Sequence, residues 1–439
     1  MPSPAIVSRA QMATTVPQED AFAKARGLRP LRIATGAFIA ASIAISLTLP
    51  EGVGIYAQFA RWALLGIACL FCLGNLLRLP LSAQAAAWLA SGIYAVGTVI
   101  YTIDIPVTVL RSLAFLALTV GAFLAGSICY QGSVGTPHRL PGRIGALLTL
   151  LAVPSFAGYL AAYPSWFFQG NLLRGIFCHA NALGAFGAMW LVVGVGGLDS
   201  RLSRYRRLLL VGPIALAACL LLSRSRAGTG GAAISILLYA LLTRQMRGIA
   251  MAGMFLATIT LSAYVALPSV TEVAMQESGQ FVRKGSKDDV LLSRRETWDT
   301  GITNFEASPL VGHGFGTSVG EETKEWRLVG LGGREKGNAF IAILEETGIL
   351  GALVMYLPVV LCVFGGFRIK RLNTYLADNP GELRNDARLA AAFWAGAMGG
   401  LVNNLAEATL WSAGSPYGGM LLFLAGASEG LVARTEHRL

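Results

Sequence analysis

Charged residues are scarce in this sequence. Asp, Glu, Lys and Arg make up 13% of its 439 residues, while hydrophobic residues make up 54%, and the mean hydropathy is +0.58. Soluble domains carry about 25% charged residues, so this chain lacks the charge to cover a water-facing surface. Apolar runs close to the roughly 20 residues that span a bilayer recur along the chain instead. They exclude a string of soluble modules and predict an all-α polytopic membrane protein.

Motifs for nucleotide and metal chemistry are also missing. The sequence holds no P-loop, no HExxH and no second CxxC beside Cys69 and Cys72. All six cysteines lie in or at the edges of apolar runs, where cysteine usually acts as a small buried hydrophobe. No DxD pattern occurs in the connections that we place outside the cytoplasm. We therefore expect no metal site and no cofactor.

The apolar runs predict about twelve spanning helices. They cover residues 31–50, 60–78, 83–103, 107–129, 144–163, 177–197, 208–223, 228–243, 249–269, 339–365, 389–407 and 414–432.

The basic residues set the expected orientation. With the N-terminus in the cytoplasm, the even-numbered connections hold clusters of arginine and lysine, whereas the early odd-numbered ones hold only Arg174. Cytoplasmic loops of membrane proteins carry such an excess. Both termini are therefore expected in the cytoplasm. The formal net charge of +11 then needs no nucleic-acid partner.

This threading divides the chain into four parts. Residues 1–30 form a polar cytoplasmic tail without a recognisable signal peptide. Residues 31–269 hold nine spanning helices, and residues 270–338 form a large outer loop. Residues 339–439 hold three further helices and the cytoplasmic C-terminus.

Some basic residues lie on the outer side, against this rule. Long loops translocate whatever their charge, so the short turn with Arg224 and Arg226 is a stronger exception than the loop. Arginine near a membrane is costly and usually marks a ligand or ion path, and its planar fork suits phosphate oxygens. Arg224, Arg226 and Arg294 would together make a diphosphate site. The alternative is that they bind the headgroups of membrane lipids.

One helix is expected inside the long loop. It begins near a capping-box pattern at residues 293–296, and Pro309 follows its end. Arg294 lies four residues before the first member of an apolar stripe, so we expect it on the face turned to the membrane body. The stripe consists of Trp298, Ile302 and Phe305.

Further polar candidates lie at the outer ends of spans. The glycine-rich segment around His313 predicts a tight turn, because no βαβ unit surrounds it as a dinucleotide loop requires. Asn338 opens the tenth span, and Glu345 and Glu346 follow seven and eight residues later. These acids face either a substrate or the lipid headgroups. His179 is a candidate for sugar or phosphate contact, or an interfacial histidine with local partners.

Four motifs occur in a fixed order and topology, and together they resemble the bacterial O-antigen ligase and polymerase superfamily. The resemblance covers roughly residues 140–430. The motifs are Ser225-Arg226-Ala227-Gly228, Arg294-x-x-x-Trp298, Pro309-Leu310-x-Gly312-x-Gly314, and Asn338 followed by Glu346-x-Gly348-x-x-Gly351.

The resemblance implies a metal-independent, inverting glycosyltransferase of the GT-C type in the bacterial inner membrane. Such a ligase moves a glycan from undecaprenyl diphosphate to the lipid A–core oligosaccharide on the periplasmic face, in lipopolysaccharide biosynthesis. The family's two arginines correspond to Arg226 and Arg294, which would hold the diphosphate and stabilise its leaving charge.

The family also places a histidine before the asparagine matched to Asn338, where it would deprotonate the acceptor hydroxyl. Here that position is Gly337, which can neither accept nor orient a proton. Three interpretations follow. The first, which we favour because the surrounding arginines and glycines are intact, is that position 337 carries a substitution. The second is that another group such as His313 or Glu346 is the base, and the third is that the protein is a degenerate relative.

Two other acceptors fit the same donor, because the acceptor pocket alone separates these enzymes. An O-antigen polymerase transfers glycan to glycan, and a protein O-oligosaccharyltransferase transfers it to Ser or Thr. A secondary transporter is the alternative of another class. It would require mid-span ionisable residues and inverted repeats, whereas Asp104 and Glu407 lie near span ends.

Overall fold

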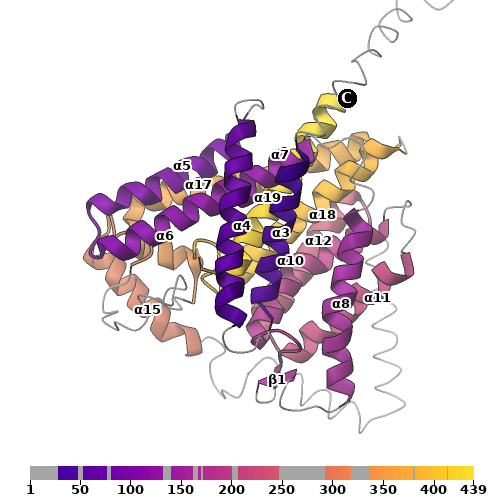
Figure 1. Cartoon of the computed structure of the whole chain (residues 1–439), viewed down its shortest axis with the longest axis horizontal. Helices are drawn as coiled ribbons and strands as arrows, with labels where there is room; N and C mark the ends of the chain where they lie inside the picture. Colours follow the sequence, from indigo (N-terminus) through magenta and orange to yellow (C-terminus); the bar gives the residue numbers. More distant parts are fainter. Residues whose placement is uncertain are drawn as a thin grey trace, which may run out of the picture.

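The described part of the protein is a bundle of helices with a small hairpin, seen here in a computed structural model (Figure 1). The structure describes residues 28–47, 53–76, 81–131, 140–161, 167–169, 172–199, 206–246, 292–317, 337–378, 381–412 and 414–439. The helices are α3 (Arg29–Ile45), α4 (Val53–Leu76), α5 (Ala83–Gly97), η1 (Thr98–Ile100), α6 (Ile105–Leu118), η2 (Thr119–Leu124), α7 (Ala125–Gln131), α8 (Leu140–Leu160), α10 (Ala180–Asp199), α11 (Arg206–Ser223), α12 (Arg226–Thr243), α15 (Leu292–Ala307), α17 (Ala339–Tyr375), α18 (Glu382–Asn403) and α19 (Pro416–Arg438). Strands β1 (Phe168–Gln169) and β2 (Leu172–Leu173) pair antiparallel.

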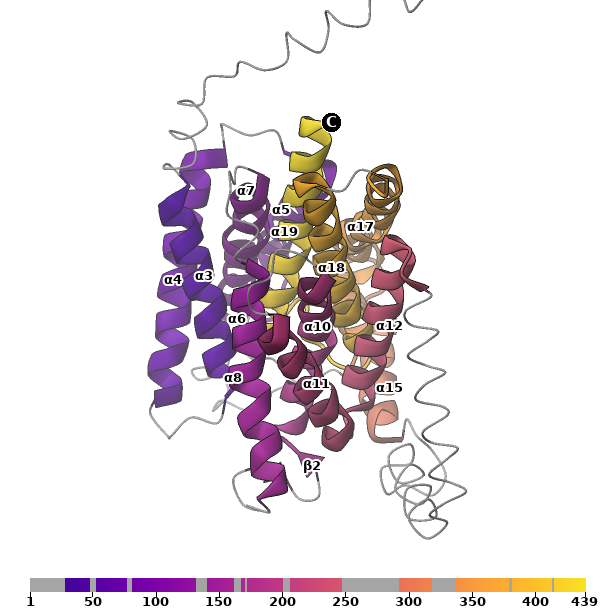
Figure 2. The same cartoon turned by 90° about the vertical axis from the view of Figure 1, so that its right-hand side faces the viewer.

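Within these described ranges, seven helices are long and apolar enough to cross a membrane. Every stretch that the sequence predicts as a span overlaps a helix, except 249–269, which lies outside the described residues. Figure 2 shows α3 beside α4, and α10 beside α8, α12 and α18, while α5 and α6 run obliquely to α3 and α4 in Figure 1. A polytopic membrane protein is therefore confirmed.

Three helices at the centre of the bundle approach one another closely through small residues. A Cβ atom on Gly231 of α12 would lie 2.5 Å from the Gly399 carbonyl oxygen of α18, and one on Gly399 would lie 2.2 Å from the Ala188 carbonyl oxygen of α10. Helices in membranes associate through such small-residue surfaces, because lipid offers no hydrophobic gain for packing larger side chains. These contacts join α10, α12 and α18 in one closely packed unit.

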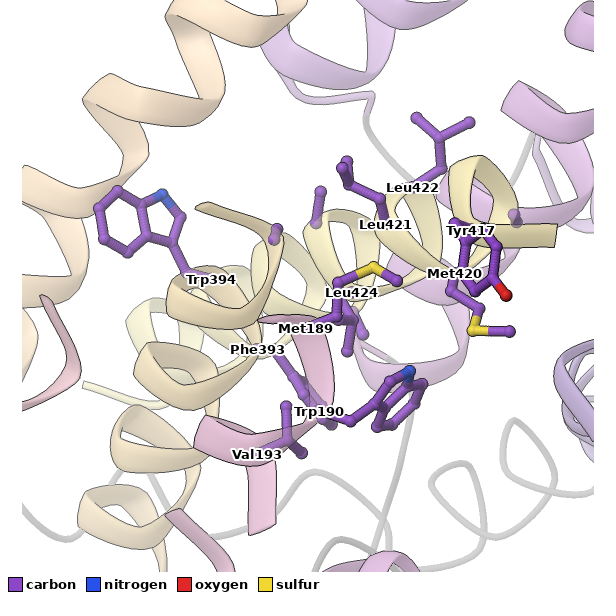
Figure 3. Packing of buried hydrophobic residues seen from close by; sticks show 14 of the residues in the cluster. Met189, Trp190, Val193, Phe393, Trp394, Tyr417, Met420, Leu421, Leu422 and Leu424 are labelled. Atoms are coloured by element: carbon purple, nitrogen blue, oxygen red, sulfur yellow. The ribbon is translucent and has the colours of Figure 1, made fainter. Parts of the chain in front are cut away.

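Large side chains fill the space between this unit and α19. Met189 and Val193 of α10 lie against Phe393 of α18 and against Leu421 and Leu424 of α19 (Figure 3). These side chains are almost completely buried. This part of the core thus joins α10, α18 and α19.

The charged ends of α18 and α19 extend both helices beyond the predicted spans. The sequence predicts spans at 389–407 and 414–432, yet α18 begins at Glu382 and α19 continues to Arg438. The reason is an ionic cluster: Arg434 Nε lies 3.4 Å from Asp386 Oδ2, and both side chains are buried. Charged residues that pair with each other can remain helical where hydropathy alone predicts a loop.

The helix α17 contains a break that the predicted span 339–365 does not anticipate. Gly348 has φ +63°, and a Cβ there would lie 2.4 Å from the Leu310 backbone. The freed amides of Ile349 and Leu350 donate to the carbonyl oxygens of Pro309 and Leu310 at 2.8 and 3.2 Å. The loop after α15 therefore completes the hydrogen bonding of a broken helix.

Candidate functional site

The turn between α11 and α12 carries the two arginines singled out in the sequence. Arg224 lies in the left-handed region with φ +52°, and its N–H donates to the Leu221 carbonyl oxygen. Arg226 is the first residue of α12, and both arginine side chains are partly exposed. Ser225 between them is buried and makes no side-chain capping bond to α12. The turn thus places two guanidinium groups at the start of a helix.

The start of α12 lies directly against the start of α10. A Cβ on Gly228 would lie 2.4 Å from the Gly184 Cα atom, and one on Gly184 would lie 2.1 Å from Ser225 Oγ. Only glycine at both positions permits this contact. Arg226 is therefore fixed beside the first turns of α10.

The start of α10 carries His179 and lies near Arg174. His179 is exposed, and its Nδ1 atom accepts a hydrogen bond of 3.0 Å from the Ala182 N–H, which caps the helix. Arg174 donates to the Cys178 carbonyl oxygen at 3.4 Å. Cysteine 178 itself is exposed, unlike the buried cysteine that the sequence predicts, because it lies in the turn before α10 rather than inside a span.

The start of α17 lies on the same end of the bundle. Gly337 has φ +64°, and the Asn338 Oδ1 atom caps α17 by accepting from the Phe340 and Ile341 amides at 2.8 and 3.2 Å. The Ala339 N–H donates to the Asn404 carbonyl oxygen at 3.0 Å. The loop between α18 and α19 therefore holds the start of α17.

That loop also reaches the start of α10. Asn181 Nδ2 donates to Glu407 Oε1 at 2.9 Å, although the two residues are 226 positions apart. From the other side, Arg61 of α4, which is fully buried, donates to the Gly414 and Ser415 carbonyl oxygens at 2.8 and 3.0 Å. The loop thus joins the starts of α10, α17 and α19. We call this region, with the start of α12, the Arg226 end of the bundle.

Helix α15 runs beside α17 in the same direction. A Cβ on Gly301 would lie 2.8 Å from Ile341, and Asn304 Nδ2 donates to Glu345 Oε1 at 2.9 Å. Gly301 lies beside Ile341, and three residues earlier on the two helices are Trp298 and Asn338. Trp298 of α15 is therefore level with Asn338. Arg294 lies two turns before Gly301 and so belongs to the same helix face. Its backbone position is near the start of α17, at the Arg226 end; its side chain lies outside the described part.

The predicted loop helix is confirmed at Leu292–Ala307, but its apolar stripe is wrong in one member. Ile302 is 44% exposed. The face against α17 is formed by Gly301 and Asn304, because a small residue permits close approach and Ile302 lies about 100° further round the helix.

The glycine-rich segment after α15 is a tight turn, as predicted. Gly312, Gly314 and Gly316 all have positive φ. Glu346 holds the turn: its carbonyl oxygen accepts from the His313 and Gly314 amides at 3.1 and 2.8 Å, and its carboxylate accepts from the Gly316 amide at 2.7 Å. His313 Nε2 lies 2.9 Å from the Asn304 carbonyl oxygen. Both proposed bases are thus engaged in fixing this turn.

We expect Glu346→Gln to leave activity close to that of the wild type, because a glutamine oxygen can still accept from the Gly316 amide. Glu346→Ala leaves a partly buried amide unpaired, at a cost of about 1–3 kcal/mol, and is expected to reduce both thermal stability and activity. Hydrogen exchange over residues 309–317 would report the loosened turn. Equal and complete loss of activity in both variants would instead assign Glu346 to proton transfer.

The Arg226 end therefore joins the starts of four helices, and Arg224 and Arg226 lie at one of these starts. Helix starts present partial positive charge and amide donors, and arginine forks bind phosphate oxygens. No group of three or more His, Cys, Asp or Glu side chains suited to a metal ion occurs among the residues that the structure describes. The arrangement is suited to binding an anion through nitrogen donors.

By fold and site, the protein is a multi-pass helical membrane protein with a cationic end. Residues 211–356 match the family model described as O-antigen ligase. This segment contains Arg224, Arg226, Arg294, Gly337 and Asn338. The predicted resemblance to the O-antigen ligase superfamily is thereby confirmed.

A curated relative supports the same superfamily. The chain is 26% identical over 274 residues to the exopolysaccharide production protein ExoQ of Rhizobium meliloti (strain 1021). The match covers 60% of this chain and 57% of the relative, so less than two thirds of the relative's length is represented.

Sequence reasoning alone did not find the contribution of the α18–α19 loop. Asn181, Asn404 and Glu407 are ordinary polar residues near span ends, and only the fold brings them together. The sequence does contain one indication of this loop, because Arg61 lies at the start of the predicted span 60–78. An arginine in such a position usually has a polar partner.

Proposed function

We propose that the protein is a glycosyltransferase that moves a glycan from undecaprenyl diphosphate to an acceptor hydroxyl at the Arg226 end. The observation that carries the proposal is the position of Arg226 at an uncapped helix start, inside the segment that matches the O-antigen ligase family. A diphosphate leaving group develops charge as the glycosidic bond breaks. Guanidinium groups and helix-start amides aimed at that charge lower the barrier.

The proposed topology follows the distribution of basic residues. Twelve spans cross the bacterial inner membrane, both termini lie in the cytoplasm, and the Arg226 end faces the periplasm. Residues 270–338 form the periplasmic loop, with α15 beside the first turns of α17. A GT-C type, inverting and metal-independent reaction suits a site whose ligands are arginines.

The preferred acceptor is the lipid A–core oligosaccharide, because the matched family is that of the O-antigen ligase. A cell-free assay tests this with one undecaprenyl-diphosphate-linked oligosaccharide as donor. Three acceptors are supplied in turn: lipid A–core, a second lipid-linked oligosaccharide, and a Ser/Thr peptide. Transfer to lipid A–core alone is expected, and absence of transfer to all three contradicts the proposal.

A second candidate is a polymerase that joins glycan to glycan. It is favoured by the match to a protein of exopolysaccharide production. In the same assay, this function gives products that grow by whole donor units when only the lipid-linked oligosaccharide is present.

Restoring histidine at position 337 is expected to raise the transfer rate if that position carries a substitution. Gly337 has φ +64°, a region in which a non-glycine residue is strained by roughly 1–2 kcal/mol. A small decrease in thermal stability should therefore accompany the gain. Initial rates of Gly337→His and Gly337→Ala provide the measurement, because alanine introduces the same strain without a base. Equal rates in the two variants would contradict a substitution at 337.

A further inference from the structure

The end of α18 is bonded directly to the start of α17. The Asn404 carbonyl oxygen accepts from the Ala339 N–H at 3.0 Å. A helix leaves its first amides and its last carbonyl oxygens without partners inside the helix, so this one bond satisfies a group at each of two helix ends. Asn338, which caps α17, directly precedes Ala339. The position of Asn338 therefore depends on that of Asn404.

The side chain of Asn404 ties the following loop back to the end of α18. It is buried at the C-terminal cap of that helix. Its Oδ1 atom accepts from the Thr409 and Leu410 amides at 2.9 and 2.7 Å and from the Thr409 hydroxyl at 3.1 Å. Its Nδ2 atom donates to the Gly400 carbonyl oxygen at 2.8 Å, one turn earlier in the helix. Both groups of the side-chain amide thus hold the chain on either side of Asn404.

Three aromatic rings pack at the same start of α17. Phe340 is the second residue of the helix, and its ring centroid lies 5.5 Å from that of Trp411 and 5.6 Å from that of Tyr356. The Tyr356 hydroxyl also donates to the Phe340 carbonyl oxygen at 2.6 Å. Trp411 directly follows Leu410, whose amide binds Asn404. The loop closed by Asn404 therefore holds α17 through ring packing as well as through the backbone.

The same loop is bonded to the helix that positions Arg226. Asn181 in the first turn of α10 donates to Glu407 Oε1 at 2.9 Å. One turn later, a Cβ on Gly184 would lie 2.1 Å from the Oγ atom of Ser225, the residue before Arg226. Contacts thus run from the start of α17 through the loop to the start of α12. The loop sets the spacing between these two helix starts.

We propose that Asn404 is a positioning residue of the transfer, which holds the start of α17 at the distance from Arg226 that the reaction requires. This inference rests on the proposed function, in which Arg226 binds the donor diphosphate and the acceptor hydroxyl meets the donor beside position 337. Asn404 is only 2% exposed, so it acts through α17 and does not touch a substrate. Reacting groups must be held in close contact, and a displacement of about 1 Å can cost about 10²-fold in rate.

Three variants separate positioning from a purely structural role. Asn404→Leu keeps nearly the same shape but can neither accept nor donate a hydrogen bond. Asn404→Asp keeps an acceptor oxygen for the loop amides and loses the donor to Gly400. Asn373→Leu is the matched control, because Asn373 is a buried asparagine that joins the same two helices at their opposite end. Its Nδ2 atom donates from α17 to the Ala387 carbonyl oxygen of α18 at 3.1 Å.

The experiment uses the full chain in nanodiscs, with the lipid-linked donor and the acceptor that the wild type uses. We expect kcat of Asn404→Leu to fall by about 10²-fold, with an unchanged Kd for undecaprenyl diphosphate, because the contact of α12 with α10 stays intact. Asn404→Asp should recover part of this loss. Asn373→Leu should lower the melting temperature as Asn404→Leu does, but keep the wild-type kcat. Hydrogen exchange over residues 337–342 should be faster in Asn404→Leu and unchanged in the control.

The outcomes distinguish this inference from the function on which it rests. If the wild type transfers glycan and Asn404→Leu has the same kcat, the positioning role alone is overturned. An equal fall in kcat for Asn373→Leu, or an Asn404→Asp variant no more active than Asn404→Leu, overturns it as well. A wild-type protein that transfers to none of the three acceptors overturns the proposed function, and the positioning role with it.

Discussion

Arg226→Ala is expected to lower kcat/KM for glycan transfer by about 10²–10³-fold, the effect of removing one donor from a site that stabilises a developing anion. Arg226 lies at the start of α12, and that start is fixed to α10 by the glycine contact at Gly184 and Gly228. Its guanidinium would meet the diphosphate as the bond to the sugar breaks. Initial rates with the lipid-linked donor provide the measurement.

Two further variants define the cause of this loss. Arg226→Lys keeps the charge without the planar fork, so we expect partial activity. Arg244→Ala removes an arginine from the other end of the same helix and should leave transfer unchanged. A nearly wild-type rate for Arg226→Ala, or an equal loss for Arg244→Ala, would contradict a local diphosphate site.

Arg294→Ala is expected to reduce transfer to a similar extent, because position 294 shares the helix face of Gly301 that lies against α17. Residues that stabilise the same charge act as a unit, and their effects are not additive. The double variant should therefore be scarcely slower than either single one. A fully additive loss would indicate that the two arginines act at separate places.

Gly228→Ala is the second change with a large expected effect. The added methyl group would lie 2.4 Å from the Gly184 backbone, which cannot yield as a flexible side chain can. Overpacking of this kind costs about 1–3 kcal/mol, and here it also separates α12 from α10. We expect a lower melting temperature and loss of most transfer activity, because Arg226 moves with the start of α12.

Gly230→Ala is the matched control on the same helix. A Cβ at this position meets no atom within 4 Å, and alanine favours a helix over glycine by about 1 kcal/mol. Its melting temperature should equal or exceed that of the wild type, with unchanged activity. If the two variants lost stability equally, the contact between α10 and α12 would not be the cause.

The sequence allowed most of the helices to be predicted, because apolar length and the basic connections depend on local composition. The predicted loop helix and the glycine turn were also correct in position. The ends of α18 and α19 were wrong because their charges are neutralised by residues distant in sequence, such as Asp386 and Arg434. Hydropathy assigns each residue a fixed preference and contains no information about such partners.

For the candidate site, the sequence singled out individual residues, and their roles stay predictions. Arg226 and Arg294 could be singled out because arginine is costly near a membrane and usually marks a functional site. The break at Gly348 was missed, since glycine in an apolar helix has several meanings and the carbonyl partners at Pro309 and Leu310 are supplied by another segment. The hydrogen bond between Asn181 and Glu407 could not be predicted because the two residues are 226 positions apart in the sequence.

The central claim is that guanidinium groups at the Arg226 end bind a prenyl diphosphate. An electron cryo-microscopy structure of the protein in nanodiscs with undecaprenyl diphosphate tests it most directly. The diphosphate is expected between Arg226 and the α15 segment that carries Arg294, with the prenyl chain running into the bilayer. A diphosphate bound at the opposite end of the bundle, or guanidinium groups turned away from it, would contradict the proposed chemistry.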